Sequence, residues 1–210
     1  MASDLAFHRL LKPLLFLACL APCARLLWGI QTDDLGPNPL ETVTHTTGDW
    51  ALRLLLVTLA MTPLRRLVHA AWPLRLRRML GLFAFFYACL HFATWLVLDQ
   101  ELRWSDIVVD IGKRPYVTVG FAAWLLLVPL ALTSTRRAMR RLGRRWSQLH
   151  KLVYLATLLA VVHYLWLVKA DLRDPLLYAA VFAGLMLLRV PWRWLFQERR
   201  TPRRGEMSGG

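Results

Sequence analysis

The sequence of 210 residues has little acidic charge, few cysteines and none of the common nucleotide-binding or hydrolytic motifs. Its 13 aspartates and glutamates face 27 lysines and arginines, and its net charge is +14. It contains no GxGxxG or phosphate-binding loop, no HExxH motif and no nucleophile elbow, so we expect no nucleotide-binding domain and no hydrolytic site. The three cysteines, Cys19, Cys23 and Cys89, all fall in apolar segments. We interpret them as small buried residues without a redox role.

Hydrophobic residues, in contrast, are abundant, at 57% of the chain with a mean hydropathy of +0.40. This composition is typical of a membrane protein. Six apolar runs approach the roughly 20 residues that span a bilayer as a helix. They cover about residues 10–28, 50–64, 79–98, 117–132, 149–168 and 176–194. The sequence therefore predicts an all-α, polytopic membrane bundle of six transmembrane helices, forming a single domain over residues 1–210.

The charges alternate between the connections of these runs. Acidic residues fall in the first, third and fifth connections, whereas arginines crowd the second, the fourth and the tail. The basic clusters are Arg65, Arg66, Arg75, Arg77 and Arg78; Arg136, Arg137, Arg140, Arg141, Arg144 and Arg145; and Arg189, Arg193, Arg199, Arg200, Arg203 and Arg204. Cytoplasmic loops carry excess arginine and lysine, so we expect both termini in the cytoplasm of a bacterial inner-membrane protein. Anionic lipid headgroups account for the net charge, and no nucleic-acid partner is needed.

Three histidines lie inside the apolar runs, where polar groups are costly unless they bind something or face a cavity. His91 lies in the third run, and His150 and His163 lie in the fifth, whereas His45 and His69 fall in the predicted loops and are interpreted as solvated. Counted from the cytoplasmic end at 1.5 Å per residue, His91 and His163 lie about 16 and 21 Å deep. Imidazole is a common axial ligand of haem iron, so this match in depth predicts a haem held between them. The alternative is that each histidine only forms an interhelical hydrogen bond that stabilises the packing of the bundle.

His150 lies about 20 Å below His163 along the same predicted helix. That separation suits a second redox centre near the inner face. On an ideal helix, however, the two imidazoles point about 140° apart. A π-bulge, a lateral offset between two centres, or a histidine that only caps the interface would each account for this angle.

Two arginines, Arg25 and Arg53, lie within apolar runs near their predicted outer ends. Such side chains can snorkel to the interface, which is our first interpretation. Pairing with a haem propionate is the alternative.

The six runs, His91 in the third and the segments LHKLVYL and VVHYLW in the fifth resemble the ferric-reductase-like transmembrane family. In showing no flavin–NADPH domain, the sequence is similar to the bacterial haem-binding subunits of this family. The resemblance implies a b-type cytochrome with at least one haem, and an association with FMN. It also implies electron flow from the quinone pool, or from a cytoplasmic flavin, to a periplasmic, molybdenum-containing methionine sulfoxide reductase of the MsrP type, which repairs oxidised envelope proteins.

The sequence departs from the pattern of this family at one position, Arg77. Family members with two haems carry a histidine at this position of the third span, so the resemblance leaves His150 without its expected partner. His150 would then use His69, another ligand or a flavin, or share the single haem with His91.

We therefore predict an electron-transfer subunit in which His91, His163 and His150 contact haem. A stand-alone ferric or quinone reductase is the first alternative. A transporter or assembly subunit without redox function is the second, and in it the histidines serve proton relay or packing.

Overall fold

The computed structural model describes residues 10–189, and all regular structure in this range is helical. The helices are α2 (Lys12–Thr32), α3 (Pro39–Val68), α4 (Trp72–Ala93), the π-helical η2 (Thr94–Asp99), α5 (Trp104–Lys113), α6 (Pro115–Leu132), α7 (Arg136–Leu142), α8 (Arg144–Leu149), α9 (Leu152–Leu167) and α10 (Arg173–Leu187). The all-α class predicted from hydropathy is confirmed.

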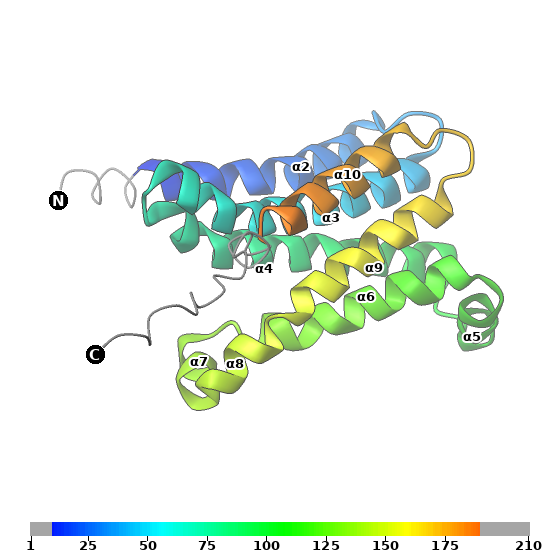
Figure 1. Ribbon diagram of the computed structural model, residues 1–210. Coiled ribbons are helices and arrows are strands. Elements are labelled where there is room, and N and C mark those ends of the chain that lie inside the picture. The colour runs from blue at the N-terminus through cyan, green and yellow to red at the C-terminus, as the bar shows by residue number, and fades with distance from the viewer. Residues whose placement is uncertain (1–9, 190–210) are drawn as a thin grey trace, which may run out of the picture.

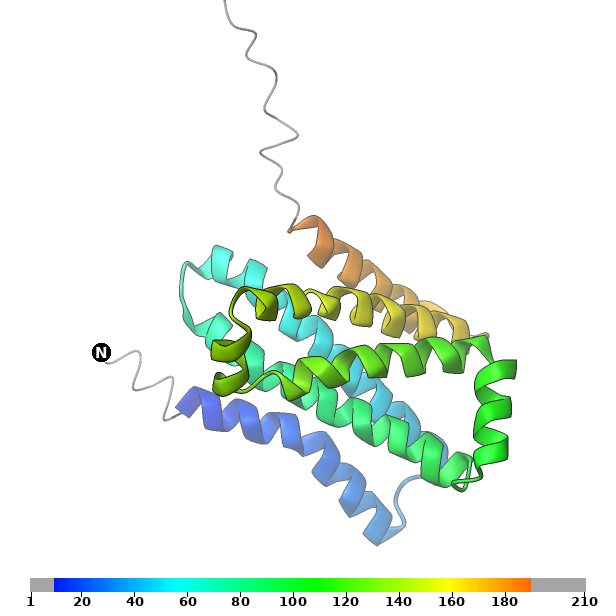
Figure 2. The ribbon, with the colours of Figure 1, turned by 90° about the horizontal axis from the view of Figure 1, so that it is seen from below.

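The long helices α2, α3, α4, α6, α9 and α10 form one bundle (Figure 1). The short helix α5 lies at one end of it, and α7 and α8 lie at the other. We call these the α5 end and the α7 end. Figure 2 shows α2 and α10 on opposite flanks, with α4, α6 and α9 between them.

Four described helices are long and apolar enough to cross a membrane, and this makes the chain a multi-pass helical membrane protein. They cover Lys12–Thr32, Trp72–Asp99, Pro115–Leu132 and Arg144–Leu167. The sequence predicted six, and the two others fall short for physical reasons. The apolar part of α3 carries the ion pair of Asp49 and Arg53, which lowers its hydropathy. Helix α10 has 15 residues and ends at Leu187, and residues 190–194 of the last predicted span lie outside the described range.

Some boundaries differ from the prediction because polar residues start helices early. Helix α3 begins at Pro39 rather than near residue 50. The Asn38 side chain accepts a hydrogen bond from the Glu41 N–H, and Pro39 occupies the first turn, where its missing N–H costs nothing. His45, expected in a loop, therefore lies in α3. The basic connection after α6 is also largely helical, with α7 and α8 separated by Gly143 at φ 49°.

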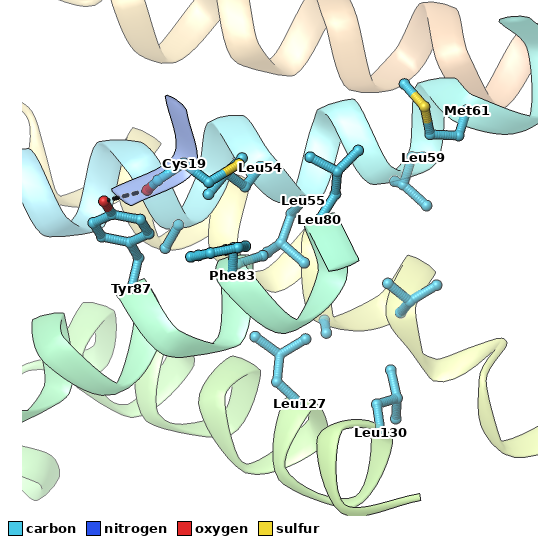
Figure 3. Packing of buried hydrophobic residues seen from close by; sticks show 14 of the residues in the cluster. Cys19, Leu54, Leu55, Leu59, Met61, Leu80, Phe83, Tyr87, Leu127 and Leu130 are labelled. Atoms are coloured by element: carbon cyan, nitrogen blue, oxygen red, sulfur yellow. Dashed lines mark hydrogen bonds between the residues drawn. The ribbon is translucent and has the colours of Figure 1, made fainter. Parts of the chain in front are cut away.

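The core lies between α3 and α4 and is closed by α2, α6 and α9 (Figure 3). Tyr87, fully buried on α4, joins α2 to this core. Its hydroxyl donates to the Cys19 carbonyl (2.7 Å) and accepts from the Cys23 N–H (3.1 Å). These two groups would bond each other in an uninterrupted helix, but Pro22 lies within this turn. The hydroxyl satisfies both groups and so fixes α2 against α4 at the turn that contains the proline.

Candidate functional site

His91 and His163 lie side by side, although they are far apart in sequence. His91 lies in the last turn of α4 and His163 in the second half of α9. Their ring centroids are 6.1 Å apart, and the rings meet at 71°. The structure thus brings together the two histidines that the depth argument paired.

Each of these rings has one nitrogen fixed by a backbone carbonyl. His91 Nδ1 lies 3.0 Å from the Thr44 carbonyl oxygen on α3, and His163 Nδ1 lies 2.7 Å from the Tyr116 carbonyl oxygen on α6. A carbonyl oxygen can only accept, so Nδ1 carries the proton and donates in both cases. In the neutral ring Nε2 is then left with a free lone pair. Histidines that bind metals are held by the same kind of hydrogen bond from the other ring nitrogen.

A glycine faces each histidine from the neighbouring helix. A Cβ on Gly48 would lie 3.1 Å from His91 Nδ1, and one on Gly120 would lie 2.7 Å from His163 Nδ1. Real Cβ atoms essentially never approach another atom to 2.7 Å, and 3.1 Å is closer than nine in ten of their contacts. The glycines therefore let the backbones of α3 and α6 come near enough to place their carbonyls on the rings.

Small residues also leave a cavity of about 470 Å³ beside the two histidines. Its walls come from α3, α4, α6 and α9, and each helix contributes an alanine there. These alanines are Ala51, Ala88, Ala123 and Ala160. Ala88 and Ala160 each precede a histidine by three positions, which places them on the same helix face. Because all four helices carry small side chains at this level, the bundle is open where the imidazoles meet.

One wall of the cavity is aromatic. Phe92 stacks on Trp124 with centroids 4.5 Å apart and an angle of 17°, and on Phe121 at 5.7 Å. These flat faces line the same cavity as the histidines. They suit a planar, largely apolar ligand, because the rings of such a ligand can make the offset-stacked or edge contacts that aromatic groups prefer.

The cavity becomes polar toward the α5 end. Its lining there includes Glu41, His45, Asp99 and Arg114. Arg114 Nε lies 2.8 Å from Asp110 Oδ1, and this carboxylate raises the pKa of Arg114. Asp110 is itself buried, with 8% of its surface exposed, and accepts from Trp95 Nε1 at 3.2 Å. The polar end is thus a connected network rather than a set of free charges.

His150 is not part of this site. It lies directly after α8, toward the α7 end, and is absent from the cavity lining. Its Nδ1 is 3.1 Å from the Trp146 carbonyl oxygen, its ring stacks on Trp146 at 4.0 Å, and its Nε2 is buried without a hydrogen-bond partner. The chain turns between α8 and α9, so the ideal-helix angle between His150 and His163 does not apply. The π-helical turns occur instead in η2.

The separation of the His91 and His163 rings matches the separation expected of two imidazoles that hold one metal ion. A metal–imidazole bond is about 2 Å long and the ring centroid lies about 1 Å beyond the nitrogen, so the centroids of two such rings are about 6 Å apart. The observed 6.1 Å agrees. Within residues 10–189 no group of three or more histidine, cysteine or acidic side chains could hold a bare ion. A metal held here needs further ligands of its own, as an iron porphyrin provides.

Sequence reasoning found the two histidines but missed the groups that orient them. The carbonyls of Thr44 and Tyr116 carry no side-chain signal. A signal for the cavity does exist: Gly48 and Ala51 on α3, and likewise Gly120 and Ala123 on α6, are spaced by three residues. This spacing puts two small residues on one face.

The sequence comparisons agree with this geometry. Residues 47–161, which contain His91 and His150 and end two residues before His163, match the family described as "Ferric reductase like transmembrane component". The chain is 53% identical over 199 residues to a "Protein-methionine-sulfoxide reductase heme-binding subunit MsrQ" from Xanthomonas axonopodis pv. citri, covering 92% of this chain and 91% of the relative.

The chain belongs to the MsrQ family. Its identity to a protein of the same name from Herminiimonas arsenicoxydans is 50% over 188 residues, covering 88% of this chain and 86% of that protein. Its identity to an MsrQ subunit from Xanthomonas campestris pv. campestris strain 8004 is 54% over 192 residues, covering 89% of this chain and 88% of that protein. No solved structure matches the chain. The resemblance that the histidine segments suggested is thereby confirmed at the level of the family.

Proposed function

We propose that this chain is the haem b-binding membrane subunit of a protein-methionine-sulfoxide reductase system, and that His91 and His163 are the axial ligands of its haem. The observation that carries the proposal is the 6.1 Å separation of two imidazoles whose Nδ1 protons are both engaged by carbonyls. The names of the MsrQ relatives support the cofactor and the system.

The residues of this chain have defined roles in the proposal. The carbonyls of Thr44 and Tyr116 hold the rings with Nε2 toward the cavity and increase the basicity of that nitrogen. When bound, haem supplies a one-electron redox centre. Haem iron held by both His91 and His163 would have no position left for oxygen, which suits electron transfer rather than oxygen chemistry.

For the arrangement in the membrane, we propose six crossings with both termini in the cytoplasm of a bacterial cell. Helix α3 lies beside the membrane-length α4 (Figure 1), and the two charges in its apolar part pair with each other. Arg53 is 3.1 Å from Asp49 and donates to the Tyr178 hydroxyl at 2.7 Å. The α7 end carries the arginines and would face the cytoplasm, because basic loops remain inside. The cavity then opens toward the periplasm.

The partners follow from this orientation and from the family. We propose that electrons enter from the quinone pool and leave at the α5 end to a periplasmic, molybdenum-containing reductase of the MsrP type. The acidic connections at that end would meet a basic face of the partner. FMN, which the resemblance implied, stays a prediction.

His150 is proposed to contact a second redox group near the α7 end. Its free, buried Nε2 supports this role, since a buried nitrogen without a partner is costly unless something binds it. A single imidazole does not make a bis-histidine site, and the neighbouring Arg77 offers no lone pair. Any group held there takes its remaining contacts from elsewhere.

The proposal is tested by reconstituting the purified chain in liposomes with a reduced quinone and the purified reductase. We expect sulfoxide reduction to require the chain and to be lost in His91→Ala, while His69→Ala, an exposed histidine at the α7 end, behaves as wild type. Reduction of ferric chelates without the reductase at the same rate would support the stand-alone alternative. A chain that carries no haem would support the transporter or assembly alternative.

A further inference from the structure

The polar end of the histidine cavity holds one permanent cation. Of the described residues that line the cavity, Arg114 is the only lysine or arginine. Haem carries two propionate carboxylates on one edge of an otherwise apolar ring. A cavity that is apolar around the histidines and polar at one end therefore favours one orientation of such a ligand, with its carboxylates toward the α5 end.

Arg114 is held in place on both its backbone and its side chain. Its backbone N–H donates to the Asp110 carbonyl at 2.9 Å, and its Nε pairs with Asp110 Oδ1 at 2.8 Å. Asp110 is anchored in turn by Trp95 at 3.2 Å and Gln100 at 3.4 Å. The guanidinium is thus fixed through Nε, and its two NH₂ groups supply further donors in a planar fork.

The same network links Arg114 to both histidines. Trp95 follows His91 by one helical turn, and Tyr116, whose carbonyl holds His163, lies two residues after Arg114. A ligand bound between the histidines with its carboxylates toward the α5 end therefore meets this arginine.

We propose that the Arg114 guanidinium binds a haem propionate and so fixes the orientation of the haem in the cavity. This inference rests on the proposed function, because it takes haem as the ligand of His91 and His163. Arginine suits the role since its fork matches a carboxylate and stays charged.

The other arginines considered from the sequence do not meet this requirement. Arg25 and Arg53 line a separate cavity between α2 and α3. The histidine cavity is also lined by the carboxylates of Glu41, Asp49 and Asp99, which repel a propionate. Arg114 is the group that offsets this repulsion.

The test compares Arg114→Gln with Arg103→Gln in the purified, haem-loaded full chain. Arg103 is a matched control because it lies at the same end and pairs with Glu101 and Asp106, but does not line the cavity. The readout is the rate of haem transfer to excess apomyoglobin. We expect Arg114→Gln to lose haem at least about tenfold faster than wild type, the usual effect of removing a charge-assisted hydrogen bond, while the low-spin spectrum persists. Arg103→Gln should match wild type.

A chemical cycle separates propionate binding from damage to the fold, because Arg114→Gln also leaves the buried Asp110 without its cation. Wild type and Arg114→Gln are each loaded with haem or with haem dimethyl ester, which lacks the carboxylate charges. If Arg114 acts through a propionate, the variant and wild type release the ester at similar rates. The double variant Arg114→Gln/Asp110→Asn, which removes both charges, should release haem as fast as Arg114→Gln.

Equal release of haem from Arg114→Gln and Arg103→Gln, or an Arg114 effect that persists in full with the ester, would overturn the inference. Both results leave the proposed function intact, because the wild type still binds haem. A wild-type chain that takes up neither haem nor the ester would instead contradict the proposed function itself.

Discussion

The two ends of the bundle use the same local device with different results. In both, a histidine donates its Nδ1 proton to a backbone carbonyl and leaves Nε2 free. At the α5 end two such histidines meet across a cavity, opposite glycines. At the α7 end His150 stands alone, stacked on Trp146 with Arg77 nearby. The hydrogen bond prepares an imidazole to bind a metal, but a bis-histidine site also needs a partner ring and empty space.

The comparison is tested most severely by removing the histidines one at a time. His91→Ala and His163→Ala should each lower the affinity for haem at the α5 end by more than about 100-fold, because loss of a ligand outweighs the 10–100-fold effect of losing its hydrogen-bonded support. Haem per chain and carbon monoxide binding in the reduced state are the measurements. Haem that remains should bind carbon monoxide, since one axial position is open.

His69→Ala is the control for these variants, because its side chain is exposed. An unchanged haem spectrum in both His91→Ala and His163→Ala would contradict the assignment of the ligands.

A second test replaces the two glycines that face the histidines, and we expect an effect of intermediate size. Gly120→Ala would place a Cβ 2.7 Å from His163 Nδ1, and Gly48→Ala one 3.1 Å from His91 Nδ1. Overpacking of this kind costs roughly 1–3 kcal/mol. We expect both variants to bind haem more weakly, Gly120→Ala more so, with a shifted or broadened spectrum. Gly184→Ala on α10, where a Cβ would meet nothing within 4 Å, should bind haem as wild type.

The polar network at the α5 end gives a smaller effect. Asp110→Ala removes the printed acceptor of Trp95 and one partner each of Gln100 and Arg114, and should lower the free energy of unfolding by about 1–3 kcal/mol. The exposed Asp106, which pairs with Arg103 at 3.3 Å, is the matched control. Asp106→Ala should cost no more than about 1 kcal/mol, as exposed ion pairs do. Thermal unfolding in detergent measures the difference, and equal costs would show that burial of Asp110 is unimportant.

The smallest change is expected at the α7 end. His150→Phe keeps the stacking on Trp146 and removes a buried nitrogen without a partner, at the expense of one hydrogen bond. The stability should therefore change by less than about 1 kcal/mol. The α5-end haem spectrum should be unchanged, while any group bound at the α7 end is lost. Disappearance of the α5-end spectrum in this variant would mean that the two ends are not separate sites.

The sequence predicted the helical membrane class, the approximate positions of the long helices and the pairing of His91 with His163. These follow from hydropathy and from depth along a helix, both of which are local quantities. The extra turns of α3 could not be predicted from apolar runs, because the Asn38 cap starts that helix in a polar segment. Arg114 was missed since its role depends on where a tertiary cavity opens. The carbonyls of Thr44 and Tyr116 were missed because backbone groups leave no trace in composition.

The most direct test of the central claim is the reduced-minus-oxidised spectrum of the detergent-purified protein, with pyridine-haemochrome quantification against protein. The account predicts sharp b-type α and β bands of a low-spin haem and at least one haem per chain. A colourless preparation after expression with ample haem would contradict it. Haem that is high-spin and five-coordinate would also contradict it, because His91 and His163 could not then both be ligands.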